Sequence, residues 1–429
     1  MAEADGPRIP QPTPFDEAPP AELPEELQPP PPGPLRVTQV LAGGVDELAV
    51  LFKRTYVFDH AQPCVPADEQ PPLAEDTVPH DEMTPGIPPS YKTIPEVVGY
   101  KTGMDVVVQA TARPTGPVSE MRVEVRIGSH RHSAMVFGKR LCEQVGGKLS
   151  FSQPEPFEEM SLRHENAYGG TDWKFFHAVG EELASRMAPE TLRRTHAVRD
   201  RFLADGHLAA YPRNRFGKGY VIDGRMEFVE GRELPNLERP EDRLTPENLV
   251  VDDPMTWNKQ PLPVGFDYMD LATFPRVAML GIPPGHEETG EPFREVALGL
   301  VPHDFSRGSW LSAQPAEVPT LLHPEVGHCS SLGLRLPFPQ SRETVVLSGM
   351  DPEHSEFEVV LPAERPVFEV PLLGRKPIEI DSKLYQITID LDQRTLGMIW
   401  CGRSPLRQSL SQKTLNELQA SVITTLKRS

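Results

Sequence analysis

The chain has 429 residues, 49 of them proline, and a formal net charge of −19 at pH 7. So many prolines exclude a mainly helical fold, because a proline inside a helix costs about 3 kcal/mol. The negative charge argues against nucleic acid and anionic membrane surfaces as partners, since both would repel the chain, and it favours contact with basic patches on other proteins. The length allows two or three domains, or one large unit with insertions.

The sequence predicts a cytoplasmic protein. Its first residues, MAEADGPRIPQ, lack the basic start and apolar run of a signal peptide. No stretch approaches the ~20 apolar residues of a membrane span. The four cysteines lie far apart without a C-x-x-C pair, which predicts buried or incidental thiols in a reducing compartment; they are Cys64, Cys142, Cys329 and Cys401.

The N-terminal part alternates proline-rich segments with strands. Residues 1–35 are rich in Pro, Glu and Asp, and are predicted to form a disordered, partly polyproline tail. The alternative is that this tail docks a polyproline-binding module. Strands are predicted over Val37–Val40 and Glu47–Asp59, because both are rich in β-branched or aromatic residues. A long loop is expected between Cys64 and Pro89, where proline and acidic residues return.

Three further strands are predicted over Asp105–Ala112, Met121–Ile127 and Ser133–Phe137, as an antiparallel meander. In the second of them apolar residues alternate strictly with charged ones. That period of two indicates a sheet with one face in water.

The one long helical pattern covers Ala178–Ala204 and should break at Pro189. Short strands then recur at roughly ten-residue spacing, which predicts a sandwich or barrel-like sheet. They are Glu343–Leu347, Glu356–Leu361, Val367–Val370, Ile378–Ile380, Leu384–Leu391 and Thr395–Trp400. The chain is expected to close with an amphipathic helix over Gln412–Arg428.

These elements predict a mainly β protein with antiparallel, sandwich-like sheets, long proline-rich loops, one inserted helical segment and a C-terminal helix. Four parts are expected along the chain. They are a disordered tail (1–35), an N-terminal β-rich region (36–310) with a helical insertion near 178–204, a C-terminal β-meander (311–405) packed on the first region, and a C-terminal amphipathic helix (406–429).

The stretch Pro154–Trp173, PEPFEEMSLRHENAYGGTDW, is the most unusual of the chain. Its two early prolines force extended backbone before Phe157. Gly169-Gly170 is a pair that accepts positive φ without steric cost. The stretch therefore predicts an extended arm, a short segment anchored by aromatic side chains, and a tight reversal.

Metal and phosphate sites are not expected. His130 and His132 point the same way on a strand but have no third ligand at a usable spacing, so they predict a solvated strand face. The group His323, His328 and Cys329 fits no zinc-finger spacing. Gly217-Lys218-Gly219 lacks the spacing of a phosphate loop and is predicted to be a turn.

No catalytic residues are predicted either. His303-Asp304 could supply parts of a triad, but adjacent residues in extended chain face opposite ways. The sequence therefore favours a binding protein without cofactor or metal. The alternative is a β-rich hydrolase or carbohydrate-active enzyme that uses His303, Asp304, or His164 with Glu165.

A series of short motifs resembles a bacterial family catalogued as a domain of unknown function, number 2169. They are TYVFD (55–59), EQPPL (69–73), K-x-G-x-DVVV (101–108), VFGKR (136–140), PEPF (154–157), AYGG-x-D (167–172), GKG (217–219), LPNLE (234–238), PHDF (302–305) and the late strand GMIWCGRSPL. They follow the family's order. One departure is Asn214-Arg215-Phe216, where the family usually has Asn-Pro.

Members of that family are found beside type VI secretion genes and are regarded as adaptors or chaperones. The resemblance implies that this chain binds a toxic protein effector in the cytoplasm and helps to load it on spike or tip proteins of the VgrG or PAAR type. It implies no catalytic residues. A further alternative is a structural component of the secretion apparatus, which would be incorporated stably.

If the chain is such an adaptor, the segments Thr55–Asp59 and Pro154–Trp173 are expected to form or support the partner-binding surface. The candidate residues are Tyr56, Asp59, Phe157, Tyr168, Gly169, Gly170 and Asp172. The alternative is that both segments are internal scaffold with buried aromatic side chains, because aromatic residues next to glycine-rich turns are usually packing anchors.

Overall fold

A computed structural model of the protein describes residues 33–42, 45–81, 89–175, 210–251, 259–270, 328–339, 343–371 and 376–428. The described residues belong to one compact unit. Most of the predicted tail (1–32) and the whole predicted helical segment (178–204) lie outside the described residues. No helix in the described ranges is long and apolar enough to cross a membrane.

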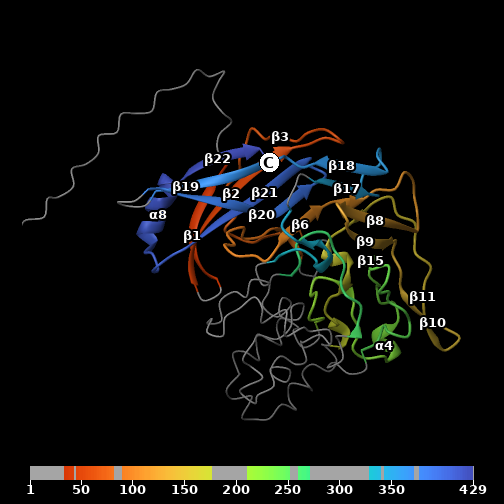
Figure 1. Ribbon diagram of the computed structural model, residues 1–429. Helices are drawn as coiled ribbons and strands as arrows, with labels where there is room; N and C mark the ends of the chain where they lie inside the picture. Colours follow the sequence, from red (N-terminus) through yellow and green to blue (C-terminus); the bar gives the residue numbers. More distant parts are fainter. Residues whose placement is uncertain are drawn as a thin grey trace, which may run out of the picture. The chain divides into compact units, whose positions relative to one another are not determined.

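The larger sheet has nine strands and is shown in Figure 1. Its main path runs β1 (Leu35–Ala42), β2 (Val45–Val57), β21 (Thr395–Pro405), β20 (Ile378–Asp390), β19 (Glu364–Val370) and β22 (Ile423–Arg428). These neighbours are antiparallel. Three strands lie off the path: β6 (Met104–Gln109) pairs parallel with the second half of β20, β16 (Arg335–Leu336) pairs with β6, and β3 (Val65–Pro66) pairs with β2.

The second sheet has five antiparallel strands. Their order is β15 (Leu237–Glu238), β9 (His130–Phe137), β8 (Glu120–Ile127), β17 (Thr344–Ser348) and β18 (Glu356–Val360). In β8, Val123, Val125 and Ile127 are buried while the residues between them are not, so the predicted alternation is confirmed. Each sheet combines early and late strands: β8 pairs with β17, and β2 pairs with β21.

The remaining elements are short. Two-stranded pairs are formed by β4 (Val78–Pro79) with β5 (Tyr91–Thr93), β7 (Thr111–Ala112) with β12 (Met160–Ser161), β10 (Cys142–Val145) with β11 (Lys148–Phe151), and β13 (Tyr168–Gly169) with β14 (Lys218–Gly219). The helical elements that lie within the described ranges are η2 (His164–Asn166), α4 (Met226–Val229), η6 (Leu332–Leu334) and α8 (Gln412–Ser421).

One hydrophobic cluster takes side chains from both larger sheets. Phe52 and Trp400 come from the nine-stranded sheet, and their ring centroids lie 5.9 Å apart. Val125 and Phe357, from the five-stranded sheet, are fully buried in the same cluster. Because apolar burial is the main favourable term in folding, this shared cluster holds the two sheets together.

The predicted fold class, mainly β with antiparallel sheets and a C-terminal helix, is confirmed. The predicted meander is wrong in one strand: β8 and β9 pair as expected, but β6 lies in the other sheet, parallel to β20. Two late strands predicted separately form the single strand β20, with an irregularity between Leu384 and Gln386.

The predicted C-terminal helix is too long. Helix α8 begins after Ser411, whose side chain accepts a hydrogen bond from Thr414 N, and it ends at Ser421. The residues from Ile423 onward form β22, which pairs with β19. Val422 to Thr425 are four β-branched residues in a row, and such residues lose side-chain freedom in a helix but pack well in a strand.

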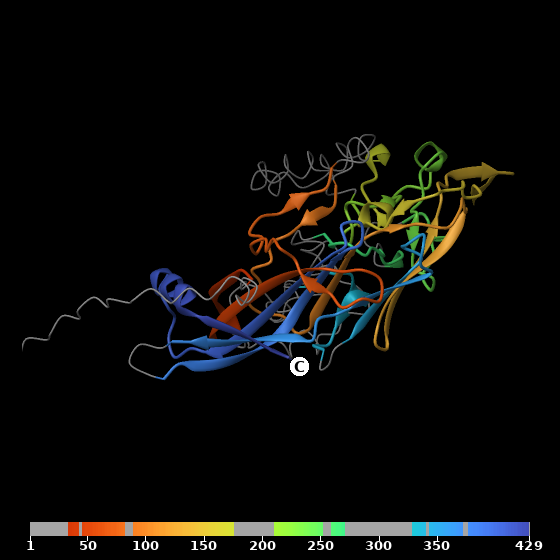
Figure 2. The same ribbon diagram turned by 90° about the horizontal axis from the view of Figure 1, so that it is seen from above.

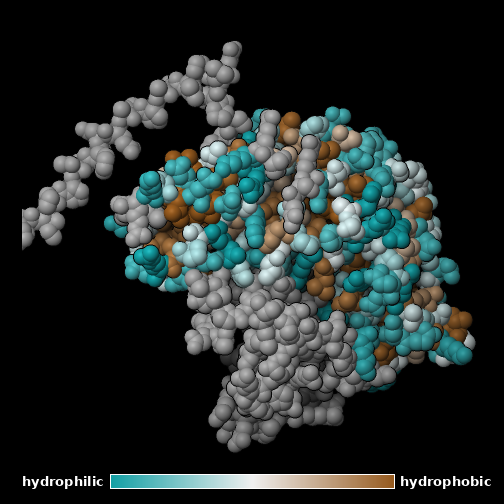
Figure 3. All heavy atoms as spheres, in the orientation of Figure 1, coloured by the Kyte–Doolittle hydropathy of each residue, from teal (hydrophilic) through white to brown (hydrophobic). Residues whose placement is uncertain are grey.

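The β10–β11 hairpin points away from the other strands in both ribbon views (Figures 1 and 2). Its turn contains Gly146 and Gly147, both with positive φ. The neighbouring Val145 is 60% exposed, and in the space-filling view of Figure 3 hydrophobic atoms stand beside hydrophilic ones at the tip of this hairpin.

Candidate functional site

Six of the seven candidate partner-binding residues are buried, and Asp59 is exposed in the segment after β2. The buried ones are Tyr56, Phe157, Tyr168, Gly169, Gly170 and Asp172. The Tyr56 hydroxyl donates a hydrogen bond to Glu364 Oε2 at 3.0 Å. Each of these six is therefore largely covered by neighbouring segments of the chain.

The stretch Pro154–Trp173 starts with an arm that pairs with the chain before β8. Phe157 exchanges two backbone hydrogen bonds with Val118, with N–O distances of 2.8 and 3.1 Å. This pairing agrees with the extended arm predicted from the prolines. The predicted tight reversal is not found, because Tyr168 and Gly169 form the short strand β13, which pairs in parallel with β14.

Gly169 and Gly170 are needed where two backbone segments cross closely. Both have positive φ, +144° and +88°, as their glycine identity predicts. A Cβ added at Gly169 would lie 2.2 Å from Asn214 O, and one at Gly170 would lie 2.0 Å from Gly217 O. Of the predicted turn Gly217-Lys218-Gly219, the last two residues instead form strand β14, which pairs with β13.

Asp172 links three segments around this crossing and has no exposed surface. Its Oδ1 accepts hydrogen bonds from Phe175 N at 3.2 Å and from Arg232 Nη2, and its Oδ2 accepts one from Ile222 N at 3.0 Å. A buried carboxylate is stable when it is paired and hydrogen-bonded in this way. Asp172 therefore fixes the position of Arg232.

These segments enclose a pocket with a volume of about 160 Å³, which we call the glycine pocket. Its lining residues come from three parts of the chain and are Gly169, Gly170, Thr171, Trp173, Arg215, Gly217, Lys218, Gly219, Tyr220, Arg232 and Glu233. Three of them are basic and one is acidic. The two glycine-rich motifs of the sequence, at 167–172 and 217–219, therefore meet at one place.

Three buried tyrosines pack together, and one of them, Tyr220, lines the glycine pocket. The ring of Tyr168 packs edge-on against Tyr211 at 5.0 Å and against Tyr220 at 6.5 Å between centroids. The Tyr168 hydroxyl donates to Gln260 Oε1, and that of Tyr211 donates to Pro261 O. Burial raises the pKa of Tyr211 to about 12 and that of Tyr168 well above its usual value. These hydroxyls stay neutral and structural at physiological pH.

His164 is the middle residue of a buried row of three polar side chains, which has the order of a Ser-His-Asp relay. Its Nδ1 lies 2.5 Å from Asp267 Oδ1, and its Nε2 lies 3.1 Å from Ser331 Oγ. The three residues are at most 3% exposed. Ser331 Oγ also donates to Gly265 O at 2.8 Å. The Ser331 hydroxyl thus connects His164 to the backbone of Gly265 within this buried arrangement.

Of the residues named in the enzyme alternative, His164 and Glu165 have different hydrogen-bond partners. His164 contacts Asp267, while the Oε1 atom of Glu165 accepts a hydrogen bond from Ser90 N at 2.6 Å. His303 and Asp304 lie outside the described residues. Asp267 and Ser331 were missed, because they lie 103 and 167 residues from His164 along the chain and nothing in their local sequence signals the contact.

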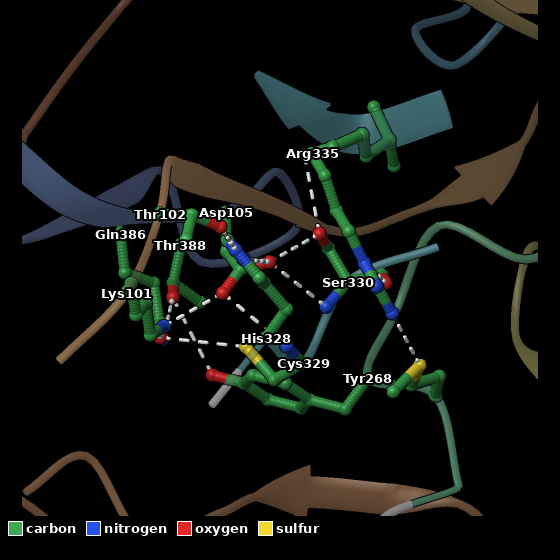
Figure 4. A network of polar contacts seen from close by, with 12 residues as sticks. Lys101, Thr102, Asp105, Tyr268, His328, Cys329, Ser330, Arg335, Gln386 and Thr388 are labelled. Atoms are coloured by element: carbon green, nitrogen blue, oxygen red, sulfur yellow. Dashed lines mark hydrogen bonds and ion pairs between the residues drawn. The ribbon is translucent and has the colours of Figure 1, made fainter. Parts of the chain in front are cut away.

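A second buried polar network, drawn in Figure 4, is centred on Asp105 of β6. Its carboxylate accepts hydrogen bonds from Lys101 Nζ at 2.6 Å and from Ser330 Oγ at 2.6 Å. His328 Nδ1 lies 3.1 Å from Asp105 Oδ1 and its Nε2 lies 3.0 Å from Thr102 Oγ1. The network joins the segment that precedes β16 to β6 and β20.

His132 was predicted to lie on a solvated strand face, and that prediction is wrong: the side chain is 6% exposed. Its ring packs edge-on against Phe266, with centroids 4.9 Å apart, and its Nε2 lies 3.3 Å from Gly265 O. His130, two residues earlier, is exposed as expected. Among the described residues, no three His, Cys, Asp or Glu side chains are grouped so as to hold a metal ion.

The burial of His132 predicts an acid-sensitive stability. Burial lowers the pKa of His132 to about 4, against about 6.5 in the unfolded chain. As the pH is lowered, the unfolded state therefore takes up a proton before the folded state does. The contribution of neutral His132 to the free energy of unfolding is complete above pH 6.5 and falls as the pH drops towards 4. Between pH 7 and pH 5 we expect a loss of about 2 kcal/mol in the free energy of unfolding.

Urea unfolding of the wild type, His132→Gln and His130→Gln at several pH values measures this loss. In His132→Gln the loss of about 2 kcal/mol between pH 7 and pH 5 should be absent. In His130→Gln, which changes an exposed histidine, the loss should be the same as in the wild type. Equal pH slopes in the wild type and His132→Gln would show that His132 does not carry the effect.

All four cysteines are free thiols, and Cys142, Cys329 and Cys401 are buried, as predicted.

A family model described as "Uncharacterized protein conserved in bacteria (DUF2169)" matches residues 43–401 of the chain. The matched range includes both glycine-rich motifs of the glycine pocket. No curated protein and no solved structure matches the chain.

Proposed function

The chain belongs to the bacterial family DUF2169, and from this membership we propose that it is a non-enzymatic cytoplasmic adaptor or chaperone for type VI secretion. In this role it binds a protein effector and helps to load it on a spike or tip protein of the VgrG or PAAR type. The observation that carries the proposal is the match of the family model over residues 43–401. Within this range two glycine-rich motifs, at 167–172 and 217–219, meet around a small pocket.

The buried polar groups support a binding role over an enzymatic one. The His164 group and the Asp105 network are hydrogen-bonded internally and covered. An active site usually combines a concave pocket with convergent polar groups that a substrate can reach. In the described residues the pocket and these titratable groups are separate: the lining of the glycine pocket contains neither His164 nor Asp105.

The open sheets support binding of another chain. Strand β22 is last in the order of the nine-stranded sheet. The outer side of β18 in the five-stranded sheet is instead bonded to the segment after β2, through Ala61 N to Glu358 O and a bridge between Pro63 and Val360. Edge strands can accept a further strand through backbone hydrogen bonds. On β22, Ile423 is 59% exposed and could contact such a partner. The net charge of −19 would speed encounters with basic partners.

A pull-down of the tagged full-length protein from its native cell tests the proposal. We expect an effector encoded near type VI secretion genes together with a VgrG or PAAR protein, and a higher soluble yield of that effector on co-expression. Recovery of neither protein would contradict the adaptor role. Stable, stoichiometric incorporation into the assembled apparatus would support the structural alternative instead.

A further inference from the structure

The size of the glycine pocket limits what it can hold. Pockets for small molecules and cofactors usually have volumes of about 300–1,000 Å³, whereas this one has about 160 Å³. The pocket reaches solvent, because the Glu233 side chain on its wall is 46% exposed. It therefore has room for one side chain or one chain terminus of a larger partner.

Two of its three basic residues are already fixed by buried carboxylates. Arg215 donates through Nε and Nη2 to the two oxygens of Asp270, at 2.7 and 3.1 Å. Arg232 donates to Asp172. Both carboxylates are completely covered. These pairs neutralise the two guanidinium groups and hold them as walls of the pocket.

Lys218 is held differently. Its Nζ lies 3.8 Å from Glu233 Oε2, which is longer than a hydrogen bond. The same carboxylate is shared with Lys139, whose Nζ lies 3.7 Å from Oε1. One partly exposed carboxylate thus serves two ammonium groups. The Lys218 side chain is only 22% exposed, and its burial lowers its pKa, because the charged form is poorly solvated there.

We propose that the glycine pocket receives a single carboxylate of a protein partner, bound by Lys218. An incoming carboxylate would give the Lys218 ammonium the short, charge-assisted hydrogen bond that Glu233 does not provide. A singly charged group fits better than a phosphate, because both arginines of the pocket are already paired with aspartates. The inference rests on the proposed function, which supplies the protein partner.

The rest of the pocket is arranged in advance of binding. Gly170 and Gly217 bring two backbone segments so close that a Cβ on either would meet backbone oxygen at 2.5 Å or less. Tyr220 lines the pocket, and its buried ring packs edge-on against that of Tyr168. A rigid site of this kind loses little conformational entropy when a partner binds.

Titration of the full-length protein with small carboxylates tests the proposal. The probes are N-acetylglycylglycine, with a C-terminal carboxylate, N-acetylglutamate α-amide, with a side-chain carboxylate, and the neutral N-acetylglutamine α-amide. Binding is followed by saturation-transfer NMR and by tryptophan fluorescence, since Trp173 lines the pocket. We expect a Kd in the millimolar range, or about −4 kcal/mol, for at least one carboxylate and at least tenfold weaker binding of the amide.

Three lysine variants make the test specific. Lys218→Met should weaken carboxylate binding about tenfold or more, and Lys218→Arg should restore part of it. Lys139→Met is the matched control, because Lys139 shares Glu233 but does not line the pocket; it should change Kd by less than about twofold. Circular dichroism spectra and unfolding midpoints establish that each variant is folded.

Equal binding of the amide probe, or unchanged carboxylate binding in folded Lys218→Met, would overturn the proposal. Tighter binding of inorganic phosphate than of either carboxylate would overturn the assignment of the ligand class. The relative affinity of the two carboxylates identifies the source as a chain terminus or a side chain.

The pull-down separates this inference from the proposed function. A wild-type protein that recovers its effector, beside a Lys218→Met protein that recovers it equally well, contradicts the role of the pocket but not the adaptor function. Carboxylate binding by a protein that recovers no effector or spike protein contradicts the adaptor function and leaves the carboxylate site in place without a protein partner.

Discussion

Replacing Asp105 by asparagine is expected to lower the free energy of unfolding by about 3–5 kcal/mol. The reason is the buried ammonium group of Lys101, which is 3% exposed and 2.6 Å from the Asp105 carboxylate. An amide at position 105 carries no charge to balance it. The amide would also offer an NH₂ donor where the carboxylate accepts hydrogen bonds from Ser330 and Cys329.

Neighbouring side chains keep the Asp105 carboxyl group deprotonated. Burial alone would raise the pKa of this carboxyl, but Lys101 and His328 hold it well below its usual range. The Asp105 carboxylate therefore contributes to stability at pH values above about 4, the pKa of an aspartate in the unfolded chain. This contribution is lost as the pH falls from there towards the lower pKa of the folded protein.

Chemical denaturation of Asp105→Asn and of Asp392→Asn measures the effect. Asp392 makes an ion pair with Arg113 at 2.5 Å, but both side chains are at least 33% exposed, so its loss should cost at most about 1 kcal/mol. A loss below 1 kcal/mol for Asp105→Asn as well would mean that the buried pair is not a stabilising link. The double variant Lys101→Met/Asp105→Asn should recover part of the lost stability, since no charge is then left buried alone.

Gly170→Ala is expected to destabilise the protein by about 2–5 kcal/mol. A non-glycine residue at positive φ costs roughly 1–2 kcal/mol, and forcing a methyl group into filled space costs typically 1–3 kcal/mol. Gly170 has φ +88°, and its Cβ would lie 2.0 Å from a backbone oxygen. Backbone cannot rotate away as a side chain can, so both costs apply.

Two other glycines separate these costs. Gly147 has φ +80° but an added Cβ would meet nothing within 4 Å, so Gly147→Ala should show the conformational cost alone, about 1–2 kcal/mol. Gly116 has neither the positive φ nor a close neighbour, so Gly116→Ala should be within about 0.5 kcal/mol of the wild type. Thermal unfolding followed by circular dichroism ranks the three variants; equal losses for Gly170→Ala and Gly147→Ala would rule out the close crossing as a source of stability.

Local patterns predicted much of the secondary structure and little of the site. The alternation in Met121–Ile127 placed its apolar residues on the buried face, and the β-rich class followed from the many prolines and the spacing of the late strands. The prediction for His132 failed because exposure depends on what packs on the strand: Phe266 and Gly265, far along the chain, cover this histidine. The end of α8 could have been found from the β-branched run after Ser421.

For the candidate site, the sequence identified the residue types but not their neighbours. The pair Gly169-Gly170 signalled positive φ, because glycine alone adopts it at no steric cost. The sequence does not show which backbone lies against the pair, because the contacting residues, Asn214 and Gly217, are about fifty positions away in the chain. Likewise Asp172 was only one acid among many in an acidic chain until Arg232 and Ile222 were seen to converge on it.

The sequence by itself therefore determined the fold class, the family and the local backbone preferences, since proline, glycine and hydrophobic period act through neighbouring residues. The tertiary structure alone decided which charges are paired, which histidines are buried and where the two glycine-rich motifs meet. Those properties depend on burial and on contacts between residues remote in the chain, and a single sequence carries no local signal for either.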